Sequence, residues 1–277
     1  MERNEQRESR GKQQSKKERL RGHDKDAPDI RISKTLSWVL RHGASSEGLF
    51  MRPDGYVRVK DLLALPKLHM LDFMMLERIV QEDTKMRYHL LLNADTNPDA
   101  SGDAAQIWWI RANQGHSIKS IKLDLTPITD SGQVPMAVHG TTLQAWAKIQ
   151  RQGLSKMNRN HIHLAQGVAG EGVISGMRTS SQVLIYIDLS KALKAGIKFH
   201  ISENGVVLSE GDEKGFLRPE FFWRVERANR QPIPGWEGPV GGLDVLTSKM
   251  EAIKVTEAEE PSNQDPLSSN TEEKSTS

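Results

Sequence analysis

Arginine and histidine side chains that could bind phosphate lie at the ends of apolar segments of this sequence. Arg41 and His42 follow the apolar segment Trp-Val-Leu. Arg111 ends the run Ile-Trp-Trp-Ile-Arg, and Arg178 precedes the run Val-Leu-Ile-Tyr-Ile. A guanidinium group is always cationic, and its planar fork matches two phosphate oxygens at once. The pattern therefore predicts a site for a multiply charged phosphate.

The competing interpretation is that each arginine is a solvated residue at the end of an element, as most arginines are. Arg111 and Arg178 weigh against it, because both border strongly apolar strands where a guanidinium needs partners. If Arg41 lies close to His42, its charge lowers the pKa of the imidazole and favours the neutral form. The sequence suggests no Ser-His-Asp arrangement or paired carboxylates for hydrolysis.

A second candidate is the tripeptide His139-Gly140-Thr141. A glycine at the end of a strand lets a flat ligand approach the backbone closely, and a neighbouring histidine can bond a ribose hydroxyl. Taken alone, the motif favours a simpler interpretation, a strand-to-helix turn in which Thr141 caps the helix.

His161 and His163 lie on one face of a predicted strand, because side chains alternate along a strand. A metal site would need a third nitrogen, sulfur or carboxylate ligand, and no other close pair has ligand spacing, so we predict no metal. We expect one of the two histidines to point into a cleft; the alternative is two surface histidines on an edge strand. The following loop, residues 166–175, is neither a Walker loop nor a dinucleotide fingerprint, and it fits both a mobile lid and an ordinary loop.

The composition indicates a folded middle with two unfolded ends. Only 36% of the 277 residues are apolar, and the shortfall lies in residues 1–27 and 256–277. These ends are too polar to bury much surface, so we expect a disordered basic head and a disordered acidic tail. Because the whole chain carries +2, the head +3 and the tail −5, residues 28–255 carry +4. That excess allows a polyanionic partner without requiring one.

The sequence contains no cysteine, which excludes disulfides and thiolate metal sites and fits a reducing compartment. It has no apolar run of the roughly 20 residues that span a bilayer, and no apolar signal-peptide core. We expect a soluble intracellular protein of the nucleus, the cytoplasm or both. A monomer is favoured, because no apolar stripe is left unassigned.

The elements that would position these residues divide into two unlike halves, and hence predict an α+β fold. In the first half, the pattern predicts a helix at residues 29–44, a short helix from residue 61 and a third helix after the cap Asp72. A hairpin of strands 88–91 and 107–111 follows. Asp29 or Ser33 is the expected cap of the first helix. This order is typical of a winged helix, although a fold alone establishes no function.

Residues 118–134 show little periodicity and are predicted to link the halves. After them the pattern becomes rich in strands: 136–140, 162–165, 183–188, 199–202 and 206–209, with a helix at 143–152 and a short one from residue 191. Asn204-Gly205 between two of these strands predicts a hairpin.

Several of these segments, in the same order, resemble the tRNA 2′-phosphotransferases, which remove the splice-junction 2′-phosphate using NAD⁺. The resemblance covers residues 28–227. It rests on Leu-Ser-Trp-Val-Leu-Arg-His-Gly-Ala (36–44), Pro-Asp-Gly-Tyr-Val (53–57), Ile-Arg-Ala-Asn-Gln-Gly-His-Ser (110–117), Val-His-Gly-Thr (138–141), His-Ile-His-Leu-Ala (161–165), Val-Ile-Ser-Gly-Met-Arg (173–178) and Asn-Gly-Val-Val-Leu (204–208).

The resemblance implies a winged-helix RNA lobe at residues 28–117, a linker at 118–134 and an ADP-ribosyltransferase-like, β-rich NAD⁺ lobe at 135–227. A C-terminal extension, 228–255, then precedes the tail. The implied catalytic set is Arg41, His42, Arg111 and Arg178. The implied NAD⁺ contacts are His139, Gly140, Thr141 and His163, with further contributions from Asn113, Gly115, His116 and Ser117.

The implied reaction has two steps and uses no metal. The 2′-phosphate of the tRNA or RNA attacks the nicotinamide ribose of NAD⁺ and displaces nicotinamide. A ribose hydroxyl then attacks the phosphate, which gives 2′-OH RNA and ADP-ribose 1″,2″-cyclic phosphate. We expect Arg41 to grip the RNA phosphate, Arg111 and Arg178 to act mainly in the second step, and His42 to orient a hydroxyl or move a proton.

Two other functions remain open on sequence alone. An ADP-ribosyltransferase that acts on nucleic-acid phosphate ends or on protein would share the NAD⁺ lobe and stop after the first step. A winged-helix RNA-binding protein without catalysis would be indifferent to NAD⁺ and to the 2′-phosphate.

Overall fold

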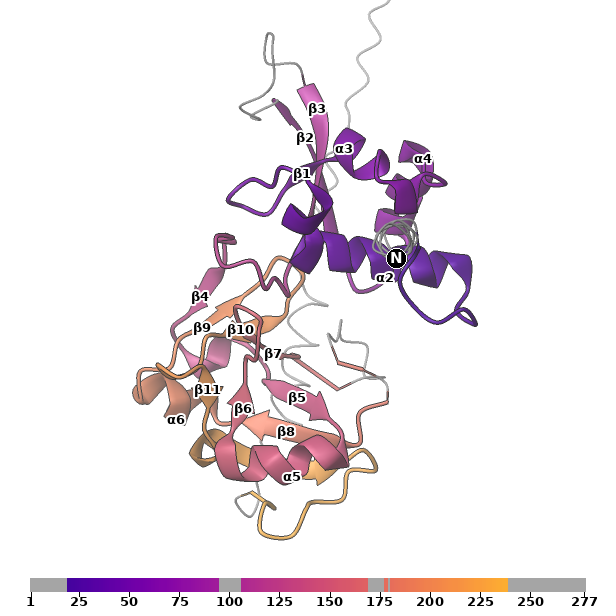
Figure 1. The fold of residues 1–277 in the computed structure, drawn as a ribbon. Coiled ribbons are helices and arrows are strands. Elements are labelled where there is room, and N and C mark those ends of the chain that lie inside the picture. Colours follow the sequence, from indigo (N-terminus) through magenta and orange to yellow (C-terminus); the bar gives the residue numbers. More distant parts are fainter. Residues whose placement is uncertain (1–18, 95–105, 169–176, 179, 239–277) are drawn as a thin grey trace, which may run out of the picture. The chain divides into compact units, whose positions relative to one another are not determined.

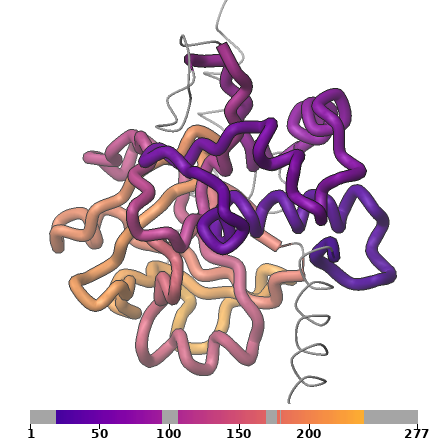
Figure 2. The backbone as a smooth tube through the Cα atoms, turned by 45° about the horizontal axis from the view of Figure 1, so that its top comes forward, coloured from indigo at the N-terminus to yellow at the C-terminus, as the bar shows by residue number. Residues whose placement is uncertain are grey.

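The computed structural model of the chain describes residues 19–94, 106–168, 177–178 and 180–238. These residues belong to one compact unit that ends at Gly238. They combine helices with antiparallel sheets around two hydrophobic clusters, which confirms the predicted α+β class (Figures 1 and 2). The predicted tail and most of the predicted head lie outside the described residues, and so does most of the loop 166–175.

The first cluster is built from helices and one sheet. Its elements are α2 (Pro28–Trp38), η1 (Val39–Gly43), η2 (Ser45–Glu47), β1 (Val57–Arg58), α3 (Val59–Leu63), η3 (Pro66–Leu68), α4 (Phe73–Gln81), β2 (Tyr88–Ala94) and β3 (Gln106–Ala112). The strands pair in the order β1-β3-β2, and both pairings are antiparallel. The order of helices and hairpin is the one predicted; its assignment as a winged helix remains a prediction.

The first helix differs from the prediction at both ends. It begins at Pro28, with Ala27 at the cap position and no side-chain cap, whereas Asp29 or Ser33 was the expected cap. A proline suits the first turn because its missing N–H has no partner there in any helix. The helix then widens into the π-helical turn η1, which carries Arg41 and His42. Asp72 caps α4 as predicted, since its side chain accepts from the Met75 N–H at 2.8 Å.

The second cluster is built mainly from short strands. Its elements are β4 (Thr126–Ile128), η4 (Ser131–Gln133), β5 (Val138–Thr141), α5 (Leu143–Gln152), β6 (Leu154–Ser155), β7 (Ile162–Leu164), β8 (Val183–Ile187), α6 (Leu189–Lys194), β9 (Phe199–Ile201), β10 (Val207–Ser209), β11 (Phe216–Leu217), η5 (Pro219–Phe221) and β12 (Phe222–Arg227). They form sheets of order β4-β9-β10-β7, β12-β8-β5 and β11-β6. β8 is buried along its whole length, as expected of the most apolar strand in the chain.

Three local features of this cluster differ from or match the predicted elements. β9 and β10 pair in antiparallel register around Asn204-Gly205, which confirms the hairpin. The helix α5 is capped by Thr142, whose hydroxyl accepts from the Ala145 N–H at 3.2 Å, and not by Thr141 as predicted. Within residues 118–134, Thr126–Ile128 forms β4, which pairs with β9, and Ile128 is buried in the second cluster.

No helix in the described part of the chain is long and apolar enough to cross a membrane.

The turn after α5 gives a test of this fold. Gly153 has a φ of +93°, and a Cβ there would lie 2.4 Å from the backbone oxygen of Leu217. We expect Gly153→Ala to lower the free energy of unfolding by more than about 3 kcal/mol, because strain and a backbone clash add. Gly48→Ala is the control: its φ is +75°, but no atom lies within 4 Å. It should cost about 1 kcal/mol. Equal losses in urea unfolding would contradict the packing described at Gly153.

Candidate active site

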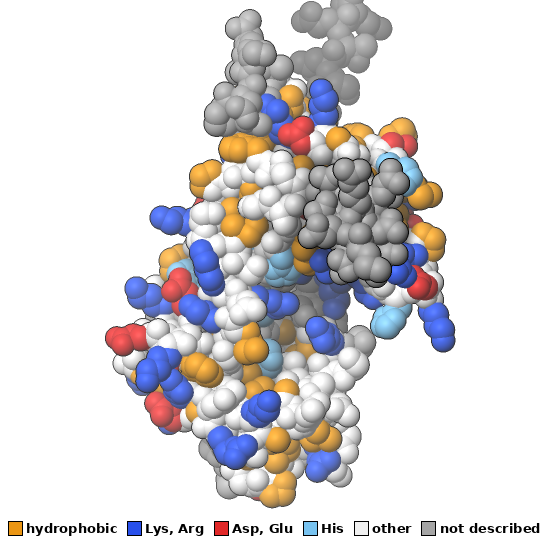
Figure 3. Space-filling model, viewed as in Figure 1, with side chains coloured by type: hydrophobic (Ala, Val, Ile, Leu, Met, Phe, Trp, Pro, Cys, Tyr) orange, Lys and Arg blue, Asp and Glu red, His pale blue; other side chains and the backbone are white. Residues whose placement is uncertain are grey.

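A pocket of about 600 Å³ is lined by residues of both clusters. Five of its lining side chains are cationic: Arg41, Lys85, Arg87, Arg159 and Arg178. None of the described residues that line it is acidic. Lys, Arg and His side chains gather in the middle of the face shown in Figure 3. A group of cations around a hollow whose described lining contains no acid is what a polyanionic ligand requires.

Arg41 supplies the most deeply buried cation of the pocket. Its Nε and Nη2 atoms are buried and have no hydrogen-bond partner among the described residues. Burial is the largest cause that lowers the pKa of Arg41, although a guanidinium stays protonated at any physiological pH. Gly115, with a φ of +91°, lies behind it, and a Cβ there would come within 3.2 Å of Arg41 Nε. A buried charge without a partner is costly, so these donors are placed for an anion that binds from outside.

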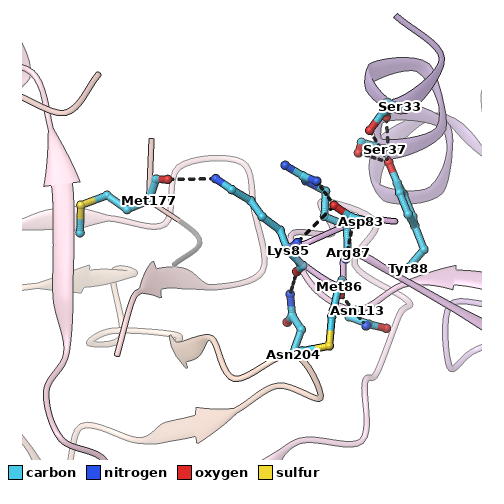
Figure 4. Close-up of polar contacts among 10 residues, drawn as sticks. All are labelled: Ser33, Ser37, Asp83, Lys85, Met86, Arg87, Tyr88, Asn113, Met177 and Asn204. Atoms are coloured by element: carbon cyan, nitrogen blue, oxygen red, sulfur yellow. Dashed lines mark hydrogen bonds and ion pairs between the residues drawn. The ribbon is translucent and has the colours of Figure 1, made fainter. Parts of the chain in front are cut away.

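Arg87 and Lys85 come from the segment 83–88, which leads into β2 (Figure 4). Asp83 pairs with the Arg87 side chain and also accepts from the Arg87 N–H at 2.6 Å. Lys85 donates through Nζ to the Met177 carbonyl at 3.1 Å, which links this segment to the residue before Arg178. Burial, and then the charge of Arg87, lowers the pKa of Lys85.

The segment 83–88 is fixed from several sides (Figure 4). Asn113 donates to the Met86 carbonyl at 2.8 Å, and Asn204 donates to the Lys85 carbonyl at 3.0 Å. Tyr88 donates to the Ser33 carbonyl of α2 at 2.8 Å. Two pocket cations are therefore held on a backbone with partners in both clusters.

Arg159 and Arg178 complete the cationic lining. Arg159 lies between β6 and β7, and partial desolvation is the largest cause that lowers its pKa. Repulsion from Arg178 lowers the Arg159 pKa further, so the two guanidinium groups are close enough to repel each other. Such mutual repulsion is relieved when an anion binds between like charges.

His42 lies beside this pocket rather than in its lining. Its Nδ1 shares a hydrogen bond of 2.9 Å with the Ser117 hydroxyl. Its pKa is lowered, first by burial and then by the charges of Arg159 and Arg41, which confirms the predicted direction. The neutral imidazole that results can accept a proton near pH 7.

The residues predicted to hold NAD⁺ belong to the same pocket. His139, Gly140, Thr141 and His163 all line the pocket. His139 Nδ1 bonds the His163 carbonyl at 3.0 Å, and burial is the main cause that lowers the pKa of both imidazoles. His163 Nε2 is buried with no partner among the described residues, and a Cβ on Gly140 would lie 2.3 Å from Met177 Cγ. A side chain at position 140 would therefore require Met177 to move, and the His163 nitrogen without a described partner belongs to the same pocket.

Of the histidine pair at 161 and 163, His163 lines the pocket and His161 does not, as expected for one histidine in a cleft. The described residues contain no group of three His, Cys, Asp or Glu side chains that could hold a metal ion.

The other four residues predicted as NAD⁺ contacts lie outside the pocket lining and contact residues that form it. The Ser117 N–H donates to the Arg41 carbonyl at 3.0 Å, besides the bond of its hydroxyl to His42. His116 is only 2% exposed, and burial lowers its pKa to about 3. Asn113 and Gly115 contact the segment 83–88 and Arg41 as described above. None of these four lines the pocket, whereas their neighbour Gln114 does.

Arg111 is not brought to the pocket. Its Nη2 donates to Glu203 at 2.8 Å, its Nη1 donates to the Asp54 carbonyl at 3.4 Å, and its guanidinium lies 4.7 Å from the centroid of the Tyr56 ring. A strand-end arginine can satisfy its charge with a carboxylate from elsewhere in the fold, which the sequence did not reveal. This contact ties β3 to the turn between β9 and β10.

Sequence reasoning missed Arg87 and Arg159, which line the pocket where Arg111 does not. Arg87 precedes the apolar strand of residues 88–91, so the criterion that singled out Arg178 also applies to it. Arg159 stands two residues before His161, in a segment singled out for its histidines. Both signals were present, but the sequence alone did not separate these arginines from the other arginines of the chain.

Comparison with known proteins identifies the class. The model of the RNA 2′-phosphotransferase, Tpt1 / KptA family matches residues 27–211. The chain therefore belongs to this family.

Curated relatives agree with this assignment. The tRNA 2′-phosphotransferase 1 of Danio rerio is 46% identical over 76% of this chain and 90% of its own length. The human protein of that name is 42% identical over 74% of this chain and 79% of its own length. The tRNA 2′-phosphotransferase of Saccharomyces cerevisiae is 43% identical over 67% of this chain and 80% of its own length.

The buried His116 makes a prediction about pH. With a folded-state pKa of about 3 and an ordinary unfolded value, the unfolded chain binds more protons between these two pKa values. The contribution of neutral His116 to the free energy of unfolding is therefore fully present above the pKa of the unfolded chain. It decreases as the pH drops below that pKa, by at most about 1.4 kcal/mol per pH unit. When the pH falls from 7 to 5, the free energy of unfolding of His116→Asn should decrease by about 2 kcal/mol less than that of the unsubstituted chain, as measured by urea unfolding. If the free energy of unfolding decreased equally in both chains over this pH range, His116 would not be buried in its neutral form.

Proposed function

We propose that this chain removes a 2′-phosphate from RNA and transfers it to NAD⁺, with tRNA as the natural substrate. The family assignment supports the reaction class, and the relatives named tRNA 2′-phosphotransferases support the substrate. The observation that carries the proposal is the pocket with five cationic side chains and no acidic side chain among its described lining residues.

Electrostatics gives the reason for so many cations. A 2′-phosphate dianion brought within ~5 Å of a pyrophosphate is repelled by several kcal/mol at moderate dielectric. Fixed guanidinium groups offset that repulsion, and they need no reorganisation when charge moves onto phosphate oxygens. Arg41, Arg87 and Arg159 suit this role because each lines the pocket and two of them come from one cluster and one from the other.

The residues of the pocket also fit NAD⁺. The buried Nε2 of His163 has no partner among the described residues, and the Met177 side chain lies where a side chain on Gly140 would be. We assign His139, Gly140, Thr141 and His163 to hold the dinucleotide, with neutral imidazoles suited to ribose hydroxyls. When bound, NAD⁺ supplies an electrophilic ribose carbon with nicotinamide as its leaving group. The overall route is the two-step transfer implied by the resemblance.

The protein's own side chains then divide the work. Arg41 and Arg87 bind the RNA phosphate. Arg159 and Arg178 stabilise the negative charge on the attacking and leaving oxygens. His42 accepts or donates a proton through its imidazole. Arg111 acts as a positioning residue, because its ion pair with Glu203 holds the turn whose Asn204 bonds the Lys85 carbonyl.

The reaction itself is tested with a 2′-phosphorylated oligonucleotide and the full chain. In the presence of NAD⁺ we expect loss of the 2′-phosphate and appearance of ADP-ribose 1″,2″-cyclic phosphate by mass spectrometry, and no turnover when NAD⁺ is omitted. A stable ADP-ribosylated RNA as the end product would instead indicate an ADP-ribosyltransferase that stops after the first step. Binding without turnover would indicate an RNA-binding protein.

The assignment of the cations is tested by substitution. Arg41→Ala, Arg87→Ala and Arg159→Ala should each lower kcat at least about 100-fold, because each removes fixed charge from the transition state. Arg111→Lys keeps the pairing with Glu203 and should retain activity within about tenfold, whereas Arg111→Ala should lose more. Arg218→Ala is the control, since Arg218 pairs with Asp212 away from the pocket. Equal losses at Arg111→Lys and Arg87→Ala would place Arg111 in the site after all.

The role of Arg178 has a separate test. We expect Arg178→Ala to release nicotinamide at a rate close to that of the unsubstituted chain and to slow phosphate release from RNA. Both products are followed in one time course. If Arg178→Ala stops nicotinamide release but still converts a preformed RNA–ADP-ribose adduct to 2′-OH RNA, Arg178 acts in the first step instead.

A further inference from the structure

A second hollow, of about 850 Å³, continues from the candidate active site along α2. Arg41 and Arg87 line both hollows, so the two meet at these side chains. The second hollow is bounded by α2, by the end of α4 and by residues 21 and 22 of the segment before α2. We call this second hollow the α2 groove.

The charges of the α2 groove suit a sugar–phosphate strand. Besides the two shared arginines, its lining contains the cations Arg21, Lys34 and Arg78. Its three acids are Asp29, Glu82 and Asp83, and Asp83 is already paired with Arg87. The hydroxyls of two serines of α2 also line it. Single-stranded nucleic acid binds in grooves of this kind, where cations follow the phosphates and a planar group stacks on a base.

Arg21 and Trp38 supply the planar group. The Arg21 guanidinium lies over the indole, with its central carbon 3.6 Å from the ring centroid. The Trp38 ring is packed against Gly43, where a Cβ would lie 2.3 Å from the Trp38 Cζ3 atom. The backbone N–H of Arg21 donates to the Thr35 hydroxyl at 2.8 Å. No ion pair joins the Arg21 guanidinium to another of the described residues. Because Arg21 is exposed, the outer face of its guanidinium can stack on a base, and its side-chain N–H groups can bind a phosphate.

The segment that carries Arg21 is ordered by contacts of its own. The His23 N–H donates to Asp26 at 2.8 Å, and Lys34 of α2 pairs with Asp26 at 2.7 Å. Gly22 has a φ of +116°, and Leu20 packs against the first cluster. The match to the family begins only at residue 27, six residues after Arg21. This wall of the groove therefore comes from outside the part of the chain that defines the family.

We propose that the α2 groove holds the RNA strand next to the 2′-phosphorylated nucleotide, and that Arg21, stacked on Trp38, contacts the neighbouring nucleotide. The inference rests on the proposed function, because it takes the strand to continue from the 2′-phosphate at Arg41 and Arg87. It adds a binding element that precedes the family region.

The test compares variants of two arginines in the same segment of the full chain. Arg21→Ala removes the stacked guanidinium, and Arg21→Lys keeps the charge without the planar face. Arg19→Ala is the matched control, because Arg19 is exposed, pairs with Asp24 and does not line the groove. Binding of a fluorescent 12-nucleotide RNA with one internal 2′-phosphate is measured by anisotropy without NAD⁺. KM is measured with NAD⁺ for that RNA and for a 2′-phosphorylated dinucleotide.

We expect Arg21→Ala to weaken RNA binding and to raise KM for the 12-nucleotide RNA by about tenfold, with Arg21→Lys in between and Arg19→Ala within about twofold. The effect should be smaller for the dinucleotide, and melting temperatures should agree within about 2 °C. Equal losses for Arg19→Ala and Arg21→Ala, or no loss for Arg21→Ala, would overturn the proposal. The anisotropy experiment decides this even if the unsubstituted chain fails to release the 2′-phosphate, which would refute the proposed function alone.

Discussion

The buried, unpaired guanidinium of Arg41 is the constraint on which the rest of the site depends. A charge in this position is unfavourable in the folded protein by itself, because Nε and Nη2 have exchanged water for no partner among the described residues. Such a side chain stays in place only if the surrounding structure fixes it. The π-helical turn, the glycine behind Arg41 and the bond from Ser117 to its carbonyl provide that support. The proposed compensation is a phosphate ligand.

The scaffold around the cations links the two hydrophobic clusters. The segment 83–88 receives hydrogen bonds from Asn113 on one side and Asn204 on the other, while Lys85 reaches Met177. Arg111 and Glu203 add an ion pair between the same parts of the fold. Cations contributed by both clusters can therefore act on one ligand, and much of the polar sequence near the pocket serves to hold them there.

Much of this could be predicted from the sequence where local chemistry decides the outcome. The strands, the α4 cap at Asp72 and the hairpin at Asn204-Gly205 follow from patterns that act over a few residues. The placement of Arg41 beside His139 and His163 agrees with the predicted cleft. The predicted cap of α5 was wrong by one residue, because two adjacent threonines look alike in a sequence pattern and differ only in backbone geometry. The sequence did not distinguish Arg111 from Arg87 and Arg159, because Arg111 pairs with Glu203, a carboxylate distant in the sequence, and does not line the pocket.

The most direct measurement of the central claim is the free energy of unfolding of Arg41→Met with and without a 2′-phosphorylated oligonucleotide. If the guanidinium is buried for a ligand and not for the fold, its replacement by an apolar chain of similar length should raise the free energy of unfolding by about 1–3 kcal/mol. The oligonucleotide should then stabilise the unsubstituted chain and stabilise Arg41→Met much less. A variant that is less stable than the unsubstituted chain, and that the oligonucleotide stabilises to the same extent, would contradict the account.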